Sequence, residues 1–135
     1  MGTDISIQTE VKFDGKWHHM GYMCYPRDYQ FFGYLAGVRD EDIEPLVAPK
    51  GLPEDISETT QFIVDYETPD LHTPTWFDAN EIRQIENWLV DTRGEYNPEQ
   101  HWGYLFGNSW GGFSKYPEDR PKGIEDIRFI IWFDC

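Results

Sequence analysis

The sequence is poor in cysteine, histidine and positive charge. Only two of its 135 residues are cysteine, four are histidine and eleven are lysine or arginine. Cys24 and Cys135 do not form a C-x-x-C motif, which argues against a cysteine-based metal or redox site. Both thiols are therefore expected to be free in a reducing cytoplasm, and we expect no structural disulfide.

Long apolar stretches and familiar catalytic motifs are also missing. No apolar run approaches the roughly 20 residues that a membrane-spanning helix needs, and no signal peptide precedes the first predicted strand. The chain has no glycine-rich phosphate loop, no nucleophile elbow and no H-E-x-x-H motif. We therefore expect no membrane association and no cofactor. Enzymatic activity stays open, and a binding protein without catalysis is favoured.

Negative charge and aromatic rings are abundant. Twenty-five acidic residues against eleven basic ones give a formal charge of −14, and the acids are spread along the chain. Such a surface repels nucleic acid phosphates and anionic lipid, so direct nucleic acid binding is not expected. It suits either a basic protein partner or simple solubility. Six Trp, eight Tyr and nine Phe are more rings than a small domain readily buries, which predicts aromatic side chains at a binding surface.

The two ends of the chain alternate between apolar and polar residues. The alternation covers residues 4–13 and 127–134. A period of two predicts a β-strand with one buried face in each segment. We expect the two strands to pair in one sheet, so that their other faces carry a common set of charged side chains. These residues are Asp4, Glu10, Arg128 and Asp134.

A hairpin and a first helix are predicted next. Asp14-Gly15 predicts a tight turn, because glycine tolerates positive φ, and the chain then returns as a second strand to about residue 22. Residues 27–38 have the apolar spacing of a helix. Gly33 and Gly37 weaken this helix and are interpreted as points of close packing against another element.

A second helix is predicted to begin after Ser57, whose side chain suits an N-cap, and to end near residue 66. Its expected buried stripe consists of Phe62, Ile63 and Tyr66. The prolines that follow predict a loop over residues 69–74.

A third helix is predicted from the pair Asp78 and Glu81, which resembles a capping box, to a stop at Gly94. Residues 94–123 contain several prolines and glycines and predict a long loop. Loops of this length are uncommon unless they are functional.

Together these patterns predict one domain over residues 1–135 of the α+β class. Its antiparallel sheet contains both terminal strands, and two or three helices pack on one face of that sheet. A chain of this length is large enough to bury its own core.

The acidic residues of the terminal strands are one candidate site. Carboxylates at alternate strand positions point the same way and provide oxygen ligands for a hard cation. The candidate metal ligands are Asp4, Glu10, His72 and Asp134. The favoured alternative is a solvent-facing strand surface with an arginine salt bridge, because such ion pairs are common and contribute little stability.

Aromatic and basic residues at helix starts and in loops form another candidate site. A flat ring can stack on a nucleobase, and a guanidinium can hold a phosphate with two hydrogen bonds. The candidate ligand-binding residues are Arg27, Tyr29, Arg39, Trp76, Trp102, Trp110 and Arg128. The alternative is that these rings cover the core beneath long loops.

Several short motifs resemble a family of small uncharacterised phage and prophage proteins that typically open M-G-x-D-I-H. They are M-G-T-D-I at residues 1–5, G-L-P-E-D-I-S at residues 51–57 and I-R-F-I-I-W-F-D at residues 127–134. The resemblance implies a phage accessory protein that acts in the host bacterial cytoplasm, without an assigned activity. The family's usual histidine after D-I is Ser6 here, and its histidine-rich stretch before Trp76 is reduced to His72.

Three functional hypotheses remain. The first is non-catalytic sequestration of a small nucleotide-derived signal of host antiviral defence, by a protein that forms a homo-oligomer with pockets at its interfaces. The second is an acidic, DNA-mimicking inhibitor of a basic host defence nuclease or CRISPR complex. The third is a metal-dependent hydrolase. The sequence slightly favours the first, because of its aromatic loops and its dispersed acids.

Overall fold

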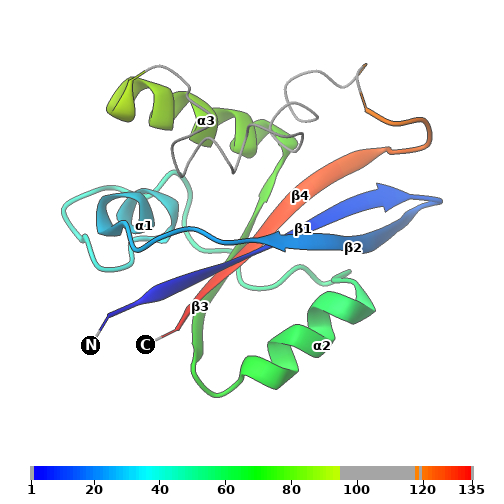
Figure 1. Cartoon of the computed structure of the whole chain (residues 1–135), viewed down its shortest axis with the longest axis horizontal. Coiled ribbons are helices and arrows are strands. Elements are labelled where there is room, and N and C mark those ends of the chain that lie inside the picture. Colours follow the sequence, from blue (N-terminus) through cyan, green and yellow to red (C-terminus); the bar gives the residue numbers. More distant parts are fainter. Residues whose placement is uncertain (1, 95–117, 119, 135) are drawn as a thin grey trace.

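Four antiparallel β-strands form one sheet in the order β2-β1-β4-β3 (Figure 1). The structure is a computed structural model that describes residues 2–94, 118 and 120–134. The central strands are β1 (Asp4–Phe13) and β4 (Asp126–Asp134), and the edge strands are β2 (Lys16–Met23) and β3 (Leu71–Asp78). The α+β class and the presence of both terminal strands in one sheet are therefore confirmed.

The pairing of β1 with β4 brings the two ends of the chain side by side. Asp4 lies opposite Asp134, and Glu10 lies opposite Arg128. Side chains alternate between the faces of a sheet, so Ile7 and its odd-numbered neighbours in β1 face one way and Glu10 faces the other. The predicted charged set therefore lies on one face, as two pairs at different points along the strands.

The turn between β1 and β2 has the conformation that its sequence predicts. Asp14 and Gly15 have φ values of 51° and 72°, and Phe13 pairs with Lys16 directly after the turn. Two successive residues with positive φ form the type I′ turn that matches the twist of a hairpin.

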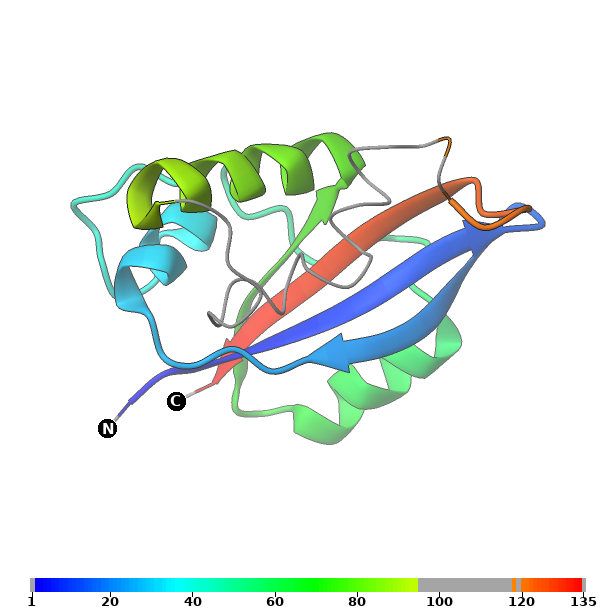
Figure 2. The same cartoon turned by 45° about the horizontal axis from the view of Figure 1, so that its top comes forward.

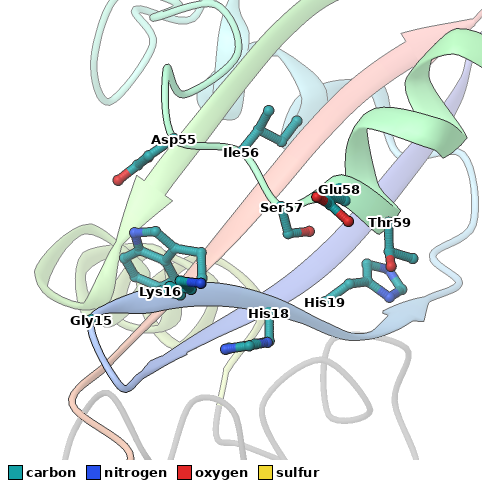
Figure 3. A pocket seen from close by; sticks show the side chains of 10 residues that line it. Gly15, Lys16, His18, His19, Asp55, Ile56, Ser57, Glu58 and Thr59 are labelled. Atoms are coloured by element: carbon teal, nitrogen blue, oxygen red, sulfur yellow. The ribbon is translucent and has the colours of Figure 1, made fainter.

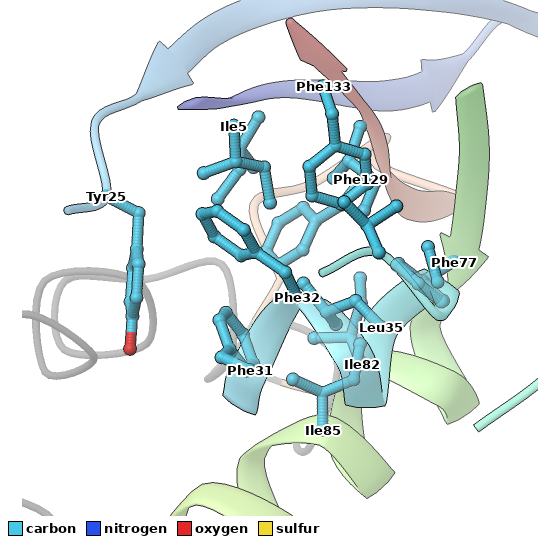
Figure 4. Packing of buried hydrophobic residues seen from close by; sticks show 14 of the residues in the cluster. Ile5, Tyr25, Phe31, Phe32, Leu35, Phe77, Ile82, Ile85, Phe129 and Phe133 are labelled. Atoms are coloured by element: carbon cyan, nitrogen blue, oxygen red, sulfur yellow. The ribbon is translucent and has the colours of Figure 1, made fainter. Parts of the chain in front are cut away.

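Two helices cover the first face of the sheet, α1 (Tyr29–Ala36) and α3 (Ala79–Arg93) (Figure 2). Apolar residues of both helices fill the main core with the odd-numbered residues of β1 and β4 (Figure 4). Members of this core include Ile5, Phe31, Phe32, Leu35, Phe77, Ile82, Ile85, Phe129 and Phe133. Helix α1 is shorter than predicted because the Asp28 side chain caps its start and Gly37, at φ 72°, ends it.

The prediction of two or three helices on one face is met by α1 and α3, and the third helix, α2 (Glu58–Glu67), lies on the opposite face (Figures 1 and 2). Val64 of α2 packs against Ile130 and Trp132 of β4, and all three are buried. Helix α2 covers this face because β4 is apolar on both sides. A strand of this kind needs cover on both faces.

The rotation of α2 about its own axis also differs from the prediction. Ser57 caps the helix as expected, accepting a hydrogen bond of 3.2 Å from the Thr60 amide. However, Thr60 and Val64 are buried, whereas Phe62 and Tyr66 of the predicted stripe are 71% and 83% exposed. The Thr60 hydroxyl donates to the buried carboxylate of Glu10 at 2.6 Å, and this polar contact turns the helix away from its most apolar stripe.

Strand β3 was not predicted, because its first residues include proline and were expected to form a loop. Pro74 lies where the β3–β4 register shifts, between His72 and Thr75, and β3 is an edge strand. Proline is tolerated at edges and bulges, where its missing N–H breaks no regular pairing.

The other predicted boundary signals are confirmed. Asp78 and Glu81 form a reciprocal capping box at the start of α3, and Gly94 follows its last residue. Most of the predicted long loop, residues 95–117, lies outside the described residues. None of the helices in the described part of the chain is long and apolar enough to cross a bilayer.

Candidate functional site

A buried ion pair joins α2 to the sheet. The Arg128 guanidinium donates to Glu10 Oε1 through Nε and Nη2 at 2.8 and 2.6 Å, and through Nη1 to Asp55 Oδ1 at 2.8 Å. Glu10 Oε2 accepts from the Ser57 amide at 3.1 Å and from the Thr60 hydroxyl. Glu10 is fully buried and Arg128 is 3% exposed, so the expected solvent-facing salt bridge is in fact an internal one.

The four candidate metal ligands do not converge. Asp4 and Asp134 lie together at one end of the sheet, and Glu10 lies six residues further along β1, which corresponds to about 20 Å of strand. The His72 ring contacts the Thr73 hydroxyl at 3.0 Å. No group of three or more His, Cys, Asp or Glu side chains in the described residues could hold a metal ion. The hydrolase hypothesis therefore has no assembled metal set among the described residues.

Cations and tryptophans alternate across the α2 face of the sheet. The Arg128 guanidinium lies 4.0 Å from the centre of the Trp17 ring and 5.9 Å from that of Trp76. Lys12 Nζ lies 5.9 Å from the Trp17 ring centre, and Lys50 Nζ lies 3.9 Å from that of Trp76. We call these five residues the cation–tryptophan series. They line an open groove of about 670 Å³.

Of the predicted ligand-binding residues that the structure describes, only Trp76 and Arg128 are brought together in this groove. Trp17 and Lys50 were missed, although the position of Trp17 after the hairpin turn places it opposite Lys12 in the β1–β2 register. Trp102 and Trp110 lie outside the described residues.

The other three predicted residues cluster around the N-terminal segment. Arg27 donates to the Asp4 carboxylate at 2.7 Å, and its guanidinium lowers the pKa of that carboxyl. Arg39 donates to the Thr3 hydroxyl at 2.7 Å and lies 5.2 Å from the centre of the Tyr29 ring. These contacts hold the start of β1 against α1, and none of the three residues lines the groove of the cation–tryptophan series.

Two of the three cations that line the groove, Arg128 and Lys50, are paired with carboxylates of the protein. Arg128 is neutralised by Glu10 and Asp55, and its guanidinium holds the pKa of the Asp55 carboxyl below its usual range. Lys50 forms a salt bridge with Glu81. The groove lining also includes Glu54, Asp55, Asp78 and Asp126. A phosphate would compete with these carboxylates for Arg128 and Lys50, which weakens the case for a nucleotide site here.

A pocket of about 610 Å³ lies between the hairpin and the start of α2 (Figure 3). His19 of β2 faces it, and its ring hydrogen-bonds Gln8 Oε1 at 2.7 Å. Burial lowers the pKa of His19, and the nearby Glu10 charge only partly opposes this. The Ser57 hydroxyl contacts that of Thr60 at 2.9 Å and caps α2. Both side chains therefore have structural partners that account for their positions.

The outward side of α2 is aromatic and acidic. Phe62 and Tyr66 are largely exposed on α2, and Tyr22 is 71% exposed on the neighbouring strand β2. Glu58 and Asp65 are exposed on the same helix. We call these five residues the α2 surface. Residues 51–82, which include α2, contain eight acids and no lysine or arginine. Sequence reasoning missed this surface, although the absence of bases could have signalled it.

No family model, no curated protein and no solved structure matches this chain. The resemblance to small phage proteins therefore stays a prediction, and a functional proposal has to start from the geometry of the described residues.

Proposed function

We propose that this protein is a non-enzymatic binding protein whose α2 surface docks on a basic surface of a partner protein. The observation that carries the proposal is the exposure of Phe62 and Tyr66 within residues 51–82, which have eight acids and no lysine or arginine, together with exposed Tyr22 on the neighbouring strand β2. Exposed aromatic side chains of this size are typical of binding hot spots, since they gain most from removal of water.

Charge supports the same interaction. A helix surface with only acidic charges, on a protein of charge −14, attracts basic partners and repels acidic ones. The aromatic residues then provide short-range contacts, while the charges accelerate the encounter and select its partner. This division of roles fits a surface that combines rings with carboxylates and contains no lysine or arginine.

The partner class that this chemistry favours is a protein with a basic, nucleic-acid-binding groove. Together with the resemblance to phage proteins, this leads us to propose a host defence nuclease or CRISPR complex as the partner. An acidic surface of this kind would occupy the groove in place of the nucleic acid. The proposal follows the second of the hypotheses from the sequence.

Affinity capture from bacterial lysate, repeated at 50 mM and 500 mM NaCl, tests the proposal. The tested variant is Phe62→Ser with Tyr66→Ser, whose exposed side chains contribute little to the fold. We expect it to lose about tenfold or more in partner binding, as for hot-spot residues. Nucleic acid binding by the recovered partner should be blocked by the native protein and not by this variant.

A matched pair of charge variants controls for non-specific attraction. Glu58→Gln with Asp65→Asn removes both acids of the α2 surface, and Glu41→Gln with Glu44→Gln removes two exposed acids elsewhere. Only the first pair should weaken binding strongly at low salt. The proposal fails if no basic partner is recovered at low salt, or if the aromatic variant binds it as well as the native protein does.

Sequestration of a nucleotide is the second candidate, favoured by the pair of tryptophans beside Arg128 in the groove of about 670 Å³. Calorimetry with cyclic and ADP-ribose-type nucleotides distinguishes it. Heat that is lost in a Trp76→Ala variant would favour this candidate, and the absence of heat would exclude it for these ligands.

A further inference from the structure

A separate groove of about 460 Å³ lies between the end of β2 and α2. Its lining includes Ser6 and Gln8 of β1, Tyr22 of β2, and Ile63 and Glu67 of α2. It adjoins the α2 surface, because Tyr22 belongs to both and Ile63 lies next to Phe62 in the helix. Figure 1 shows α2 lying beside the sheet, on the side opposite α1 and α3.

We propose that this groove binds an arginine side chain of the partner protein. The inference rests on the proposed function, since the same face would meet the partner. It adds a specific chemistry to that function: a guanidinium on an aliphatic stem, held by one carboxylate and one aromatic ring.

The charge of the groove fits a cation. Its charged lining residues are Asp4 and Glu67, and the lining contains no lysine or arginine. Asp4 is already paired with Arg27, which leaves Glu67 as the groove carboxylate for a ligand. Glu67 is the last residue of α2, and that last turn contains no basic residue. The carbonyl end of a helix is electronegative, so Glu67 and the helix end both attract a positive charge there.

The position of the Glu67 carboxylate is defined from within the fold. The buried indole N–H of Trp132 donates to Glu67 Oε2. This hydrogen bond holds the side chain in place, and the second carboxylate oxygen retains its acceptor capacity. A fixed acceptor in the lining of a groove reduces the side-chain entropy that is lost when a ligand binds.

The walls of the groove favour arginine over lysine. Tyr22 presents an aromatic ring that is 71% exposed, and Ile63 presents an aliphatic side chain. A guanidinium stacks on an aromatic face and binds a carboxylate in a planar geometry, whereas an ammonium is strongly hydrated and has no plane to stack. The aliphatic stem of arginine can pack against Ile63 while its charge reaches Glu67.

The test is an NMR titration of the whole protein with N-acetyl-arginine amide. N-acetyl-lysine amide and the uncharged N-acetyl-citrulline amide serve as comparison probes. We expect the largest shifts at Tyr22, Ile63 and Glu67, a weaker response to lysine, and none to citrulline. Glu67→Gln keeps the acceptor for Trp132 and removes the charge, and should weaken arginine binding by about tenfold.

Glu44→Gln is the matched control, because it removes one exposed charge by the same Glu-to-Gln change and lies outside both the groove and the α2 surface. It should change the affinity by less than about twofold, since an exposed charge is screened by salt. Equal effects of the two substitutions, shifts spread over the whole acidic surface, or no shifts at all would overturn the inference.

The two proposals can fail separately. If Glu67→Gln and Glu44→Gln bind the captured partner equally while Phe62→Ser with Tyr66→Ser does not bind it, the groove inference is wrong and the docking proposal stands. If the aromatic variant also binds normally, the docking proposal itself fails.

Discussion

At the residue scale, the contact between Glu10 and Arg128 organises the second face of the sheet. Both side chains are buried, and between them they accept or donate hydrogen bonds with Asp55, Ser57 and Thr60. A buried ion pair recovers its desolvation cost only when its remaining polar groups are satisfied in this way. The pair therefore acts less as a source of stability than as a device that sets where α2 begins.

This role makes single and double substitutions behave differently. Glu10→Leu leaves the buried Arg128 charge without its main partner, and should lower the free energy of unfolding by about 3 to 5 kcal/mol. Combining it with Arg128→Met removes both charges and should recover much of that loss. Urea denaturation followed by circular dichroism measures both values. A single substitution that costs less than about 1 kcal/mol would contradict this account.

At the element scale, α1 depends on a close approach that only glycine permits. A Cβ added at Gly33 would lie 2.6 Å from the Asp40 carbonyl oxygen and 2.9 Å from its Cβ. These neighbours are backbone and the first side-chain atom, so they cannot rotate away. The expectation of close packing is confirmed for Gly33, whose contact is the chain segment that follows the helix. It is wrong for Gly37, which ends the helix in the left-handed conformation and has no close neighbour among the described residues.

Gly33→Ala should therefore lower the free energy of unfolding by about 1 to 3 kcal/mol, despite the better helix propensity of alanine. Gly37→Asn is the control, because asparagine tolerates the left-handed conformation at φ 72° and the nearest atom to an added Cβ is 4.0 Å away. Thermal and urea unfolding of both variants give the comparison. A neutral or stabilising Gly33→Ala would show that the Asp40 segment can move aside.

At the scale of the whole molecule, the charge of −14 opposes compaction. Like charges repel one another more in the folded protein than in the expanded chain. Added salt screens this repulsion, and the Debye length falls to about 8 Å at physiological ionic strength. The melting temperature should therefore rise as NaCl increases from 20 to 300 mM.

Differential scanning calorimetry measures this rise, and Glu41→Gln with Glu44→Gln should make it smaller because the repulsion is weaker. A melting temperature that falls with NaCl would mean that favourable ion pairs, such as Arg27 with Asp4 and Lys50 with Glu81, outweigh the repulsion. The same screening separates stability from function: salt that stabilises the protein should weaken its attachment to a basic partner.

The local features of the fold could be predicted from the sequence, because each depends on residues close together in the chain. Alternation in residues 4–13 and 127–134 indicated strands, Asp14-Gly15 indicated the turn, and Ser57 and Asp78 indicated helix starts. Each of these signals depends on the conformation and hydrogen bonds of a few neighbouring peptide units. The tertiary structure agrees with all of them.

The candidate site depended on contacts between distant residues, and only the tertiary structure could decide it. Glu10 contacts Thr60, fifty residues away in the chain, and Arg128 on the neighbouring strand β4. These contacts turn α2 so that Phe62 and Tyr66 face outward. Helical periodicity identifies the most apolar stripe of a helix, but it does not reveal a polar partner on another element, such as the Glu10 carboxylate. The sequence by itself therefore determined the strands, the turn and the helix caps. Tertiary contacts decided which aromatic side chains are exposed at the surface, because burial depends on how the helices and the sheet pack together.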